Sequence, residues 1–327
     1  MDKLPFERDR ELLVRHEEET SAKHGTLPTR RSVEQLLNNG VVNIDKPAGP
    51  TSHEVCEWVK RILKSSKTGH AGTLDPNVTG ILVVGLGNAT KALQALLHAG
   101  KEYVCLMHLH EPVDEAALRV MLGEFTGKIY QRPPEKAAVK RILRAREIYY
   151  NKIIEIDGKD VLFKTGCEAG TYIRRLCYDL GAALGVGAHM QQLRRTKTAA
   201  FDESSIVSLQ SLTDAYVDWK ENGDEKELRK IVHPMEKALT HLPKIIVSDY
   251  AVDALCHGAQ LALPGLLKMD SGIEKGELVA CFTQKGEAVV MGKALMSSEA
   301  MEKTKKGLAI KTERVFMDEG VYPSYKK

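Results

Sequence analysis

The sequence predicts a mixed α/β (α+β) domain followed by a small β-barrel domain. From Gly40 to about Ala200, apolar strand-like runs alternate with segments whose apolar residues recur at helical spacing. From Ile245 onward, short apolar strands alternate with turns, which is typical of a small barrel. A polar break at 218–226 and the turn at Leu242-Pro243 separate the two patterns. We therefore expect an arm at 1–40, a larger domain at 41–243 and a barrel at 244–320.

Composition excludes several classes of protein. The 327 residues are 43% hydrophobic and 28% charged, an ordinary soluble balance with a net charge of only +3. No apolar run is long enough to span a bilayer, and the N-terminus carries both charge signs, unlike a signal peptide. The six cysteines are scattered without a CxxC pair, which argues against a zinc site and for reduced thiols. We expect a cytoplasmic protein with no membrane partner.

The first 40 residues are polar and mixed in charge, so they fit either an extended arm or a short helix packed on something else. The run Val41 to Lys46 then predicts a strand that leads into a Pro/Gly turn, where Thr51 or Ser52 can cap a helix. The helix has one apolar face and a basic end: Val55, Val59, Ile62 and Leu63 form the face, and Lys60, Arg61, Lys64 and Lys67 form the end. Two interpretations of this end stay open, a solvated helix terminus and a contact with RNA phosphate.

The stretch from Thr68 to Gly80 contains the strongest candidate for a reactive group. Gly69 and Gly72 flank His70 and permit a close approach of a ligand to the backbone. Pro76 disfavours a helical conformation at Asp75, and the apolar run at 81–86 predicts a buried strand directly behind it. Asp75 either closes an Asx-type turn or is a catalytic carboxylate presented on a loop.

A resemblance favours the catalytic interpretation. The motif Gly-His-Ala-Gly-Thr-Leu-Asp-Pro-x-x-Thr-Gly with an apolar strand after it resembles the active-site motif of TruB-type pseudouridine synthases. The resemblance implies that Asp75 is the essential catalytic residue and that His70 fills space or stacks beside a flipped nucleotide. The segment Asp-Lys-Pro-x-Gly-x-Thr-Ser at 45–52 resembles the family's first motif, which supports the floor of the active site. This resemblance places Lys46 among the substrate-binding residues.

The resemblance also gives a role to Tyr103 on the strand predicted at 101–107. A strand tyrosine is usually half-buried with its hydroxyl in water. In the TruB-type family a tyrosine in this Lys-x-Tyr context lies against the target base, so the resemblance implies a catalytic role for Tyr103. Whether it also accepts a proton stays open. No cofactor is expected, because the glycines at 85–87 complete neither a dinucleotide-binding motif nor a P-loop.

After this strand, a short amphipathic helix ending at Gly127 and a turn-rich link at 131–134 are predicted. A second basic cluster follows and consists of Lys136, Lys140, Arg141, Arg144 and Arg146. Bacterial members of the family carry an insertion near this region that grips transfer RNA. The sequence has little room for it, so the resemblance points to the dyskerin-type branch of archaea and eukaryotes.

The segment 167–181 predicts an amphipathic helix capped by Thr171 and resembles the family's second motif. Arg174 lies in its first turn, where a cation opposes the helix dipole, so an acidic partner elsewhere is expected. The resemblance supplies Asp75 as that partner, and it places Tyr172 with the substrate. A guanidinium binds a carboxylate through two hydrogen bonds and keeps it ionised. Arg175 reads as a surface charge.

The third motif, at 191–196, implies that Leu193 packs around the pocket, which is compatible with a plain core position. Arg194, Arg195 and Lys197 are either a solvated charge run or, beside the pocket, phosphate contacts. The barrel resembles a PUA domain, an RNA-binding module, and the resemblance implies that part of the arm packs on it.

These features together resemble the catalytic subunit of an H/ACA-type RNA pseudouridine synthase. The resemblance implies partners: substrate RNA, an H/ACA guide RNA, a small zinc-ribbon-like protein, a small β-barrel protein and a kink-turn-binding ribosomal-type protein. Asp75 would act by covalent attack or by assisting elimination. The alternative function is a non-catalytic RNA-binding scaffold for ribosome assembly with the same fold.

Overall fold

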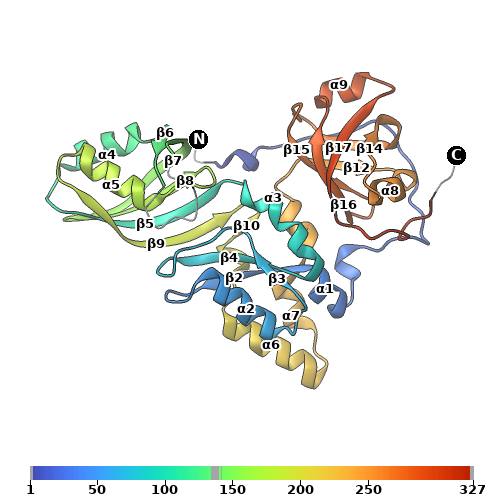
Figure 1. Ribbon diagram of the computed structural model, residues 1–327, viewed down its shortest axis with the longest axis horizontal. Helices are drawn as coiled ribbons and strands as arrows, with labels where there is room; N and C mark the ends of the chain where they lie inside the picture. Colours follow the sequence, from blue (N-terminus) through green and yellow to red (C-terminus); the bar gives the residue numbers. More distant parts are fainter. Residues whose placement is uncertain (1–2, 134–139, 141, 325–327) are drawn as a thin grey trace.

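Two β-sheets organise the chain in the computed structural model, which describes residues 3–133, 140 and 142–324 (Figure 1). Within these described residues, the larger sheet has the strand order β11-β2-β4-β9-β5-β8-β7-β6, with β3 beside β4 and β10 beside β9. Its strands are β2 (Gly40–Lys46), β3 (Thr68–His70), β4 (Thr79–Leu86), β5 (Lys101–Leu109), β6 (Gly127–Gln131), β7 (Arg144–Asp157), β8 (Asp160–Cys167), β9 (Ala188–Thr198), β10 (Phe201–Asp202) and β11 (Val232–Pro234).

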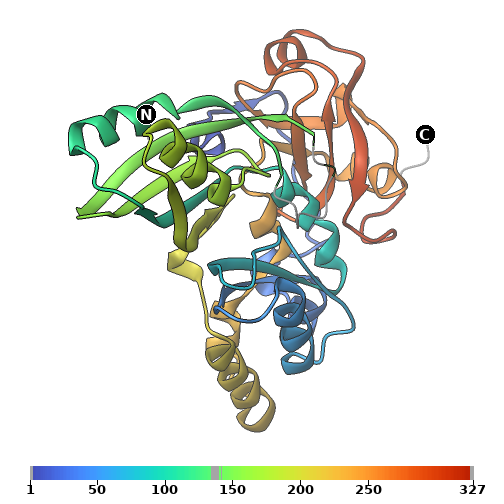
Figure 2. The same cartoon turned by 60° about the vertical axis from the view of Figure 1, so that its left-hand side comes forward.

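Helices cover this sheet in two groups: α1 (Val33–Asn39), α2 (Ser52–Ile62), α6 (Leu209–Asn222) and α7 (Lys226–Ile231) form one, and α4 (Glu115–Glu124) and α5 (Ile173–Ala183) the other (Figures 1 and 2). Short α3 (Leu93–Leu97) and the 3-10 turns η3 (Gly87–Lys91), η4 (Glu203–Ser205) and η5 (Met235–Leu239) complete the domain. Thr51 caps α2 as predicted and forms a capping box with Glu54. The buried face of α2 includes Val55 and Val59.

The second sheet forms the C-terminal domain, in the order β1-β14-β12-β15-β16-β17-β13. Its strands are β1 (Leu12–Val14), β12 (Lys244–Val247), β13 (Leu261–Ala262), β14 (Leu266–Asp270), β15 (Leu278–Phe282), β16 (Ala288–Ala294) and β17 (Leu308–Val315). The helices α8 (Asp249–Cys256) and α9 (Ser298–Lys303) and the turn η6 (Leu263–Gly265) belong to it. The predicted architecture of an α/β domain followed by a small β domain is confirmed.

The N-terminal arm divides between the two domains. Its 3-10 turns are η1 (Pro5–Glu7) and η2 (Pro28–Arg30), and its strand β1 pairs with β14 of the C-terminal domain. The helix α1 packs instead in the core of the larger domain, where Val33, Leu36 and Leu37 are buried. Part of the arm therefore packs on the C-terminal domain, and α1, near the end of the arm, belongs to the core of the larger domain.

Two local predictions were wrong in detail. The helix expected to end at Gly127 ends at Glu124, and Gly127, with φ +96°, begins β6. Gln131 is the last residue of β6 and not part of a link. Lys136 and Arg141 of the second basic cluster lie outside the described residues.

Candidate active site

The loop that carries Asp75 connects β3 to β4 and is held by buried side chains from below. The Oγ of Ser52 accepts a hydrogen bond from the N–H of Leu74 (2.9 Å) and donates one to its carbonyl (3.1 Å). The backbone of Asp75 itself turns back, with Val78 N–H donating to the Asp75 carbonyl at 3.0 Å. The Asp75 side chain points out of this fixed loop and is 56% exposed.

Lys46, which was predicted to bind substrate, lies under the loop. It is fully buried, and its Nζ donates to the carbonyls of Pro47 (2.9 Å), Pro76 (2.8 Å) and Val78 (2.9 Å). An ammonium group has three donors, so these contacts use all of them. Burial lowers the pKa of Lys46, against the opposing effect of Asp75. Lys46 therefore holds the loop from within the floor of the site and has no donor left for a substrate.

Arg195, which was predicted to be solvated or to contact phosphate, holds the two ends of the same loop. Its side chain is buried; Nε donates to Ile81 O (2.8 Å) and Nη2 to Gly72 O (3.1 Å). Because β4 and β9 pair in parallel here, Gly80 lies beside Arg195, and a Cβ on Gly80 would be 2.3 Å from the Arg195 carbonyl oxygen. Arg195 is thus neither solvated nor free for a phosphate.

Its neighbours in the predicted charge run are also occupied. Arg194 donates to both oxygens of Asp45 (2.9 and 3.1 Å) and to Glu203 (2.7 Å), and Lys197 pairs with Glu7 (2.5 Å). Both interpretations are therefore wrong for buried Arg195, whereas phosphate contact by the partly exposed Arg194 and Lys197 stays a prediction. The sequence signal for the close approach of β4 and β9 is Gly80, which has φ +97° and no room for a side chain.

Arg174 meets Asp75, as the resemblance implied. Nη2 of Arg174 donates to Oδ2 of Asp75 at 2.5 Å, although 99 residues separate them in the chain. Thr171 does not cap α5: the N-cap is Tyr172, and the Thr171 hydroxyl donates to Glu168 O (2.7 Å). Gln131 instead fixes the backbone of this N-cap residue: its amide accepts from Tyr172 N–H (3.0 Å) and donates to Tyr172 O (3.2 Å). This places Arg174 in the first turn with its guanidinium over the loop.

Tyr103 forms the inner wall beside Arg195. The two residues are cross-strand neighbours on β5 and β9. Tyr103 is only 8% exposed, so it is more deeply buried than a strand tyrosine usually is. Burial raises the pKa of the Tyr103 hydroxyl, Arg195 opposes the shift, and Asp75 adds to it. The hydroxyl is therefore protonated at neutral pH and can donate a hydrogen bond.

The remaining predicted residues lie around this centre. Burial, Arg195 and His53 lower the pKa of His70, and its Nδ1 is buried without a hydrogen-bond partner in the described part of the chain. Leu193 is half-buried and packs on the core cluster that contains Leu74 and Tyr103. Tyr172 is half-exposed at the start of α5. The substrate contacts of these three residues stay predictions.

Among the described residues, no group of three or more His, Cys, Asp or Glu side chains is arranged to hold a metal ion. In the same ranges, no helix is long and apolar enough to cross a membrane. All six cysteines are free and buried.

The fold and the site together define a class of protein. An aspartate on a rigid loop faces an arginine and a buried tyrosine, and a small β domain of PUA type follows; this is the arrangement of an RNA pseudouridine synthase. Family models match along the chain: a DKCLD domain at 2–56, the TruB family pseudouridylate synthase N-terminal domain at 60–116, the tRNA pseudouridylate synthase B C-terminal domain at 174–240 and a PUA domain at 243–316.

Relatives of known class align over the whole chain. The probable tRNA pseudouridine synthase B of Methanopyrus kandleri is 54% identical over 98% of this chain and 95% of its own, and that of Methanosarcina barkeri is 55% identical over the same shares. Cbf5 in a crystal structure of a Cbf5-Nop10-Gar1 complex matches with a TM-score of 0.95, 51% identity and 99% coverage of both chains. An H/ACA ribonucleoprotein bound to a substrate RNA containing 2′-deoxyuridine contains a chain that matches with a TM-score of 0.92 and 50% identity, over 98% of this chain and 99% of that one.

The chain belongs to the TruB family of pseudouridine synthases, in its dyskerin-type branch. It is an RNA-modifying enzyme. The family assignment thus favours the enzyme over the non-catalytic scaffold.

Proposed function

We propose that this enzyme isomerises uridine to pseudouridine at Asp75, as the catalytic subunit of a guide-RNA-directed H/ACA particle acting on ribosomal RNA and on some transfer RNA. The observation that carries the proposal is the Arg174–Asp75 contact above a loop that Lys46, Ser52 and Arg195 hold rigid. A fixed carboxylate at an open surface can meet a base that has left its stack, and base chemistry requires such flipping.

The chemistry follows from the isomeric relation of substrate and product. The N1–C1′ bond breaks, the base turns, a C5–C1′ bond forms, and the proton lost from C5 is balanced by one gained at N1. Arg174 orients Asp75 through their hydrogen bond and places a positive charge beside the carboxylate. Asp75 acts either as a nucleophile or by assisting elimination of the base. Tyr103 closes the apolar side of the pocket against the base.

The partners follow from the solved relatives. Cbf5, which resembles this chain over nearly its full length, assembles with Nop10 and Gar1, and the related H/ACA particle binds substrate RNA. We infer a guide RNA and equivalent small proteins for this chain, including the zinc-ribbon-like, β-barrel and kink-turn-binding proteins expected above. A reducing cytoplasm fits its six free cysteines.

The test is pseudouridine formation in a uridine-containing RNA, with and without an H/ACA guide and the small proteins. Product at the guide-paired uridine, and only with the guide, supports the full proposal. Product on transfer RNA without a guide would support the chemistry and limit the role of the particle. Absence of product in every arm would contradict the proposed function.

A further inference from the structure

The N-terminal arm crosses from one domain to the other and back. Near its start, Glu7 pairs with Lys197 of β9 in the catalytic domain. The strand β1 then adds to the C-terminal sheet, and α1 returns to the catalytic core (Figure 1). Because both ends of the crossing are fixed in the catalytic domain, the arm is a strap across the C-terminal domain and not a loose extension.

The middle of the strap is bound to the C-terminal domain by buried polar groups. Asp249 accepts from the backbone N–H of Ser21 at 2.8 Å, and Ser248 donates to Glu18 at 2.6 Å. Lys285 donates to the carbonyls of Ser21 and His24. These contacts fix strap residues 18–25 on the C-terminal domain before the strap turns back.

The strap then reaches a junction where it, the catalytic domain and the C-terminal domain meet at two adjacent residues, Glu287 and Ala288. The carboxylate of Glu287, which is 4% exposed, accepts from Thr26 N–H at 2.9 Å and from the Tyr322 hydroxyl at 2.9 Å. The N–H of Ala288 donates to Glu236 of the catalytic domain at 3.0 Å. One short segment of the C-terminal domain is therefore held from two sides.

Glu236 also binds the strap. Arg31 donates to both of its oxygens, at 2.8 and 2.7 Å, in the planar two-point geometry that fixes orientation. The side chains of Arg31 and Glu236 are only 13% and 10% exposed, so water screens the pair weakly. The Arg31 carbonyl in turn accepts from Arg229 of α7 at 2.9 Å. Glu236 is the one group among the described residues of the junction that contacts strap, catalytic domain and C-terminal domain together.

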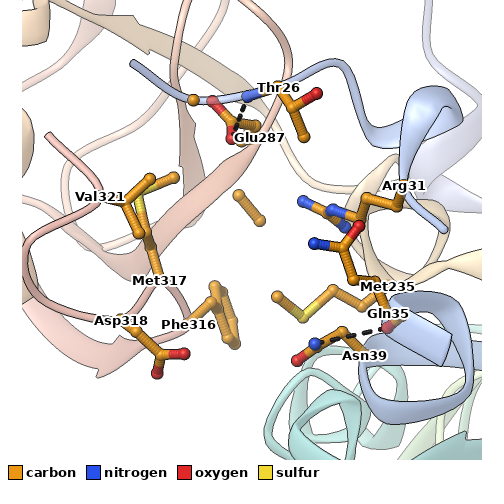
Figure 3. A pocket seen from close by; sticks show the side chains of 12 residues that line it. Thr26, Arg31, Gln35, Asn39, Met235, Glu287, Phe316, Met317, Asp318 and Val321 are labelled. Atoms are coloured by element: carbon orange, nitrogen blue, oxygen red, sulfur yellow. Dashed lines mark hydrogen bonds between the residues drawn. The ribbon is translucent and has the colours of Figure 1, made fainter. Parts of the chain in front are cut away.

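Apolar packing is incomplete beside this junction. A cavity of about 260 Å³ opens there, lined by Met235, Phe316, Met317 and Val321 together with Arg31 and Glu287 (Figure 3). The same region also joins the two domains, because Met235 and Leu239 lie in one core cluster with Phe282 and Phe316. Beside the cavity, the hydrogen bonds of Glu236 add to this apolar contact.

The junction is also linked to the catalytic loop. Met235, Ala238 and Leu239, on the same turn η5 as Glu236, lie in one buried cluster with Ala71 and Ile81, which flank the Asp75 loop. Packed interiors transmit displacements, because they have few voids and low compressibility. A tilt of the C-terminal domain at Ala288 therefore moves the surroundings of the loop.

We propose that Arg31 and Glu236 are positioning residues that set the angle between the C-terminal domain and the Asp75 loop, and so fix which uridine of a guide-bound RNA reaches Asp75. This inference rests on the proposed function and takes the C-terminal domain as the anchor of the guide RNA. A guide held on one domain presents its paired uridine to the other at a distance that the junction sets. Neither residue contacts the reacting atoms.

The test compares Arg31→Ala, Arg31→Lys and Glu236→Gln in the assembled particle. Glu236→Gln keeps a carbonyl oxygen for Ala288 N–H but removes the charge, and Arg31→Lys keeps the charge without the planar fork. The matched control is Arg30→Ala, an exposed neighbour in the strap. Guide affinity, single-turnover rate at the paired uridine and the position of the product are measured, with a thermal melt for each variant.

The expected result is guide affinity close to the wild type and a rate lowered by roughly 10-fold or more, because a misplacement of about 1 Å can cost 10²-fold. Part of the remaining product is expected at a neighbouring uridine, a change that mere loss of stability would not cause. Arg30→Ala should match the wild type. The rate of Arg31→Lys should lie between the rates of the wild type and of Arg31→Ala.

A wild-type rate and a single product position in folded Arg31→Lys and Glu236→Gln would overturn the inference. A particle whose wild-type enzyme makes no guide-directed product would instead contradict the proposed function. The two failures are therefore distinguishable.

Discussion

Nη2 of Arg174 lies 2.5 Å from Oδ2 of Asp75, and both side chains are 56% exposed. A buried partner would be left as a stranded charge on removal of the other and would cost about 3–5 kcal/mol. An exposed pair is hydrated and screened, and contributes about 0–1 kcal/mol. The contact therefore serves orientation of the carboxylate far more than stability of the fold.

For Arg174→Ala we accordingly expect a large loss of turnover with almost no change in thermal stability. Arg174→Lys should recover little activity, since its ammonium is a compact point charge on a shorter stem and does not place a donor where Nη2 of Arg174 lies. Single-turnover rates and melting temperatures of the two variants check this. A melting temperature that falls with the rate would mean that Arg174 supports the fold and not the carboxylate.

Asp75→Asn should fold, bind RNA and form no product. The amide is nearly isosteric, and the loop is held through its backbone by Ser52 and Lys46, so its shape does not depend on the carboxylate. Pseudouridine content after long incubation is the measurement, with RNA affinity as the control. Substantial product from this variant would remove Asp75 from the mechanism.

The sequence predicted the reactive pair but not what holds it. Asp75 was found because its whole motif resembles the active-site motif of TruB-type synthases. Arg174 was found because a cation in the first turn of a helix needs an acidic partner, which the same resemblance supplied. The role of Arg195 could not be found, because a buried arginine that donates to backbone carbonyls has the same sequence signature as a surface charge. Its burial depends on the register of β9 between β4 and β5, which is a tertiary property.

The strap could not be predicted from the sequence, for a related reason. Residues 1–40 have little apolar periodicity, and their order comes from single polar contacts with residues more than 200 positions away, such as that of Arg31 with Glu236. The α/β domain and the short strands of the C-terminal domain, by contrast, can be predicted from local apolar patterns. Sequence patterns thus give the elements, while the junction between domains needs the structure.

Lys46→Met should lower both stability and turnover. The substitution keeps much of the side-chain volume but leaves the carbonyls of Pro47, Pro76 and Val78 without their donor. A buried polar group without a partner costs about 1–3 kcal/mol. Urea unfolding and single-turnover rates provide the check, with exposed Lys67→Met as the control. If Lys46→Met lost RNA affinity and kept its stability, the original assignment of Lys46 to substrate binding would be restored.

His241 should make the fold acid-sensitive. Burial lowers its pKa to about 4, and its Nε2 lies 3.1 Å from Ala95 O. The unfolded chain takes up a proton below the usual value of 6.5, whereas the folded chain does so only near 4, so acidification favours unfolding across this range. The stabilisation is complete above pH 6.5 and decreases by roughly 3 kcal/mol at most as the pH falls to 4.

Unfolding of His241→Gln between pH 7 and pH 4 tests this, because glutamine can donate to Ala95 O and does not titrate. The variant should lose less stability on acidification than the wild type. Parallel curves for the two proteins would show that other groups cause the acid sensitivity.

The last prediction concerns where the guide RNA is anchored. Removal of everything after Leu242 is a poor test, because Phe282, Met291 and Phe316 of the C-terminal domain pack in one cluster with Leu239 of the catalytic domain. The truncated chain would expose that apolar surface. Charge removal on the intact chain is sharper, and the structure offers two exposed basic groups. One is Lys303, Lys305 and Lys306, from the end of α9 to just before β17, and the other is Arg61, Lys64 and Lys67, in the last turn of α2 and just after it.

Affinity from phosphate contacts falls with salt, with a slope of roughly 0.7 per neutralised charge on single strands and about 0.9 on duplexes. If the C-terminal domain anchors the guide, glutamine at Lys303, Lys305 and Lys306 should weaken guide binding and reduce that slope by about 2. Glutamine at Arg61, Lys64 and Lys67 should leave both unchanged. Guide affinity at several salt concentrations decides between them. The opposite result would place the anchor on the catalytic domain and favour phosphate contact at the end of α2. Thr51 and Glu54 cap the other end of this helix. Its basic residues Arg61, Lys64 and Lys67 have no ion pair in the described part of the chain and are therefore available for phosphate.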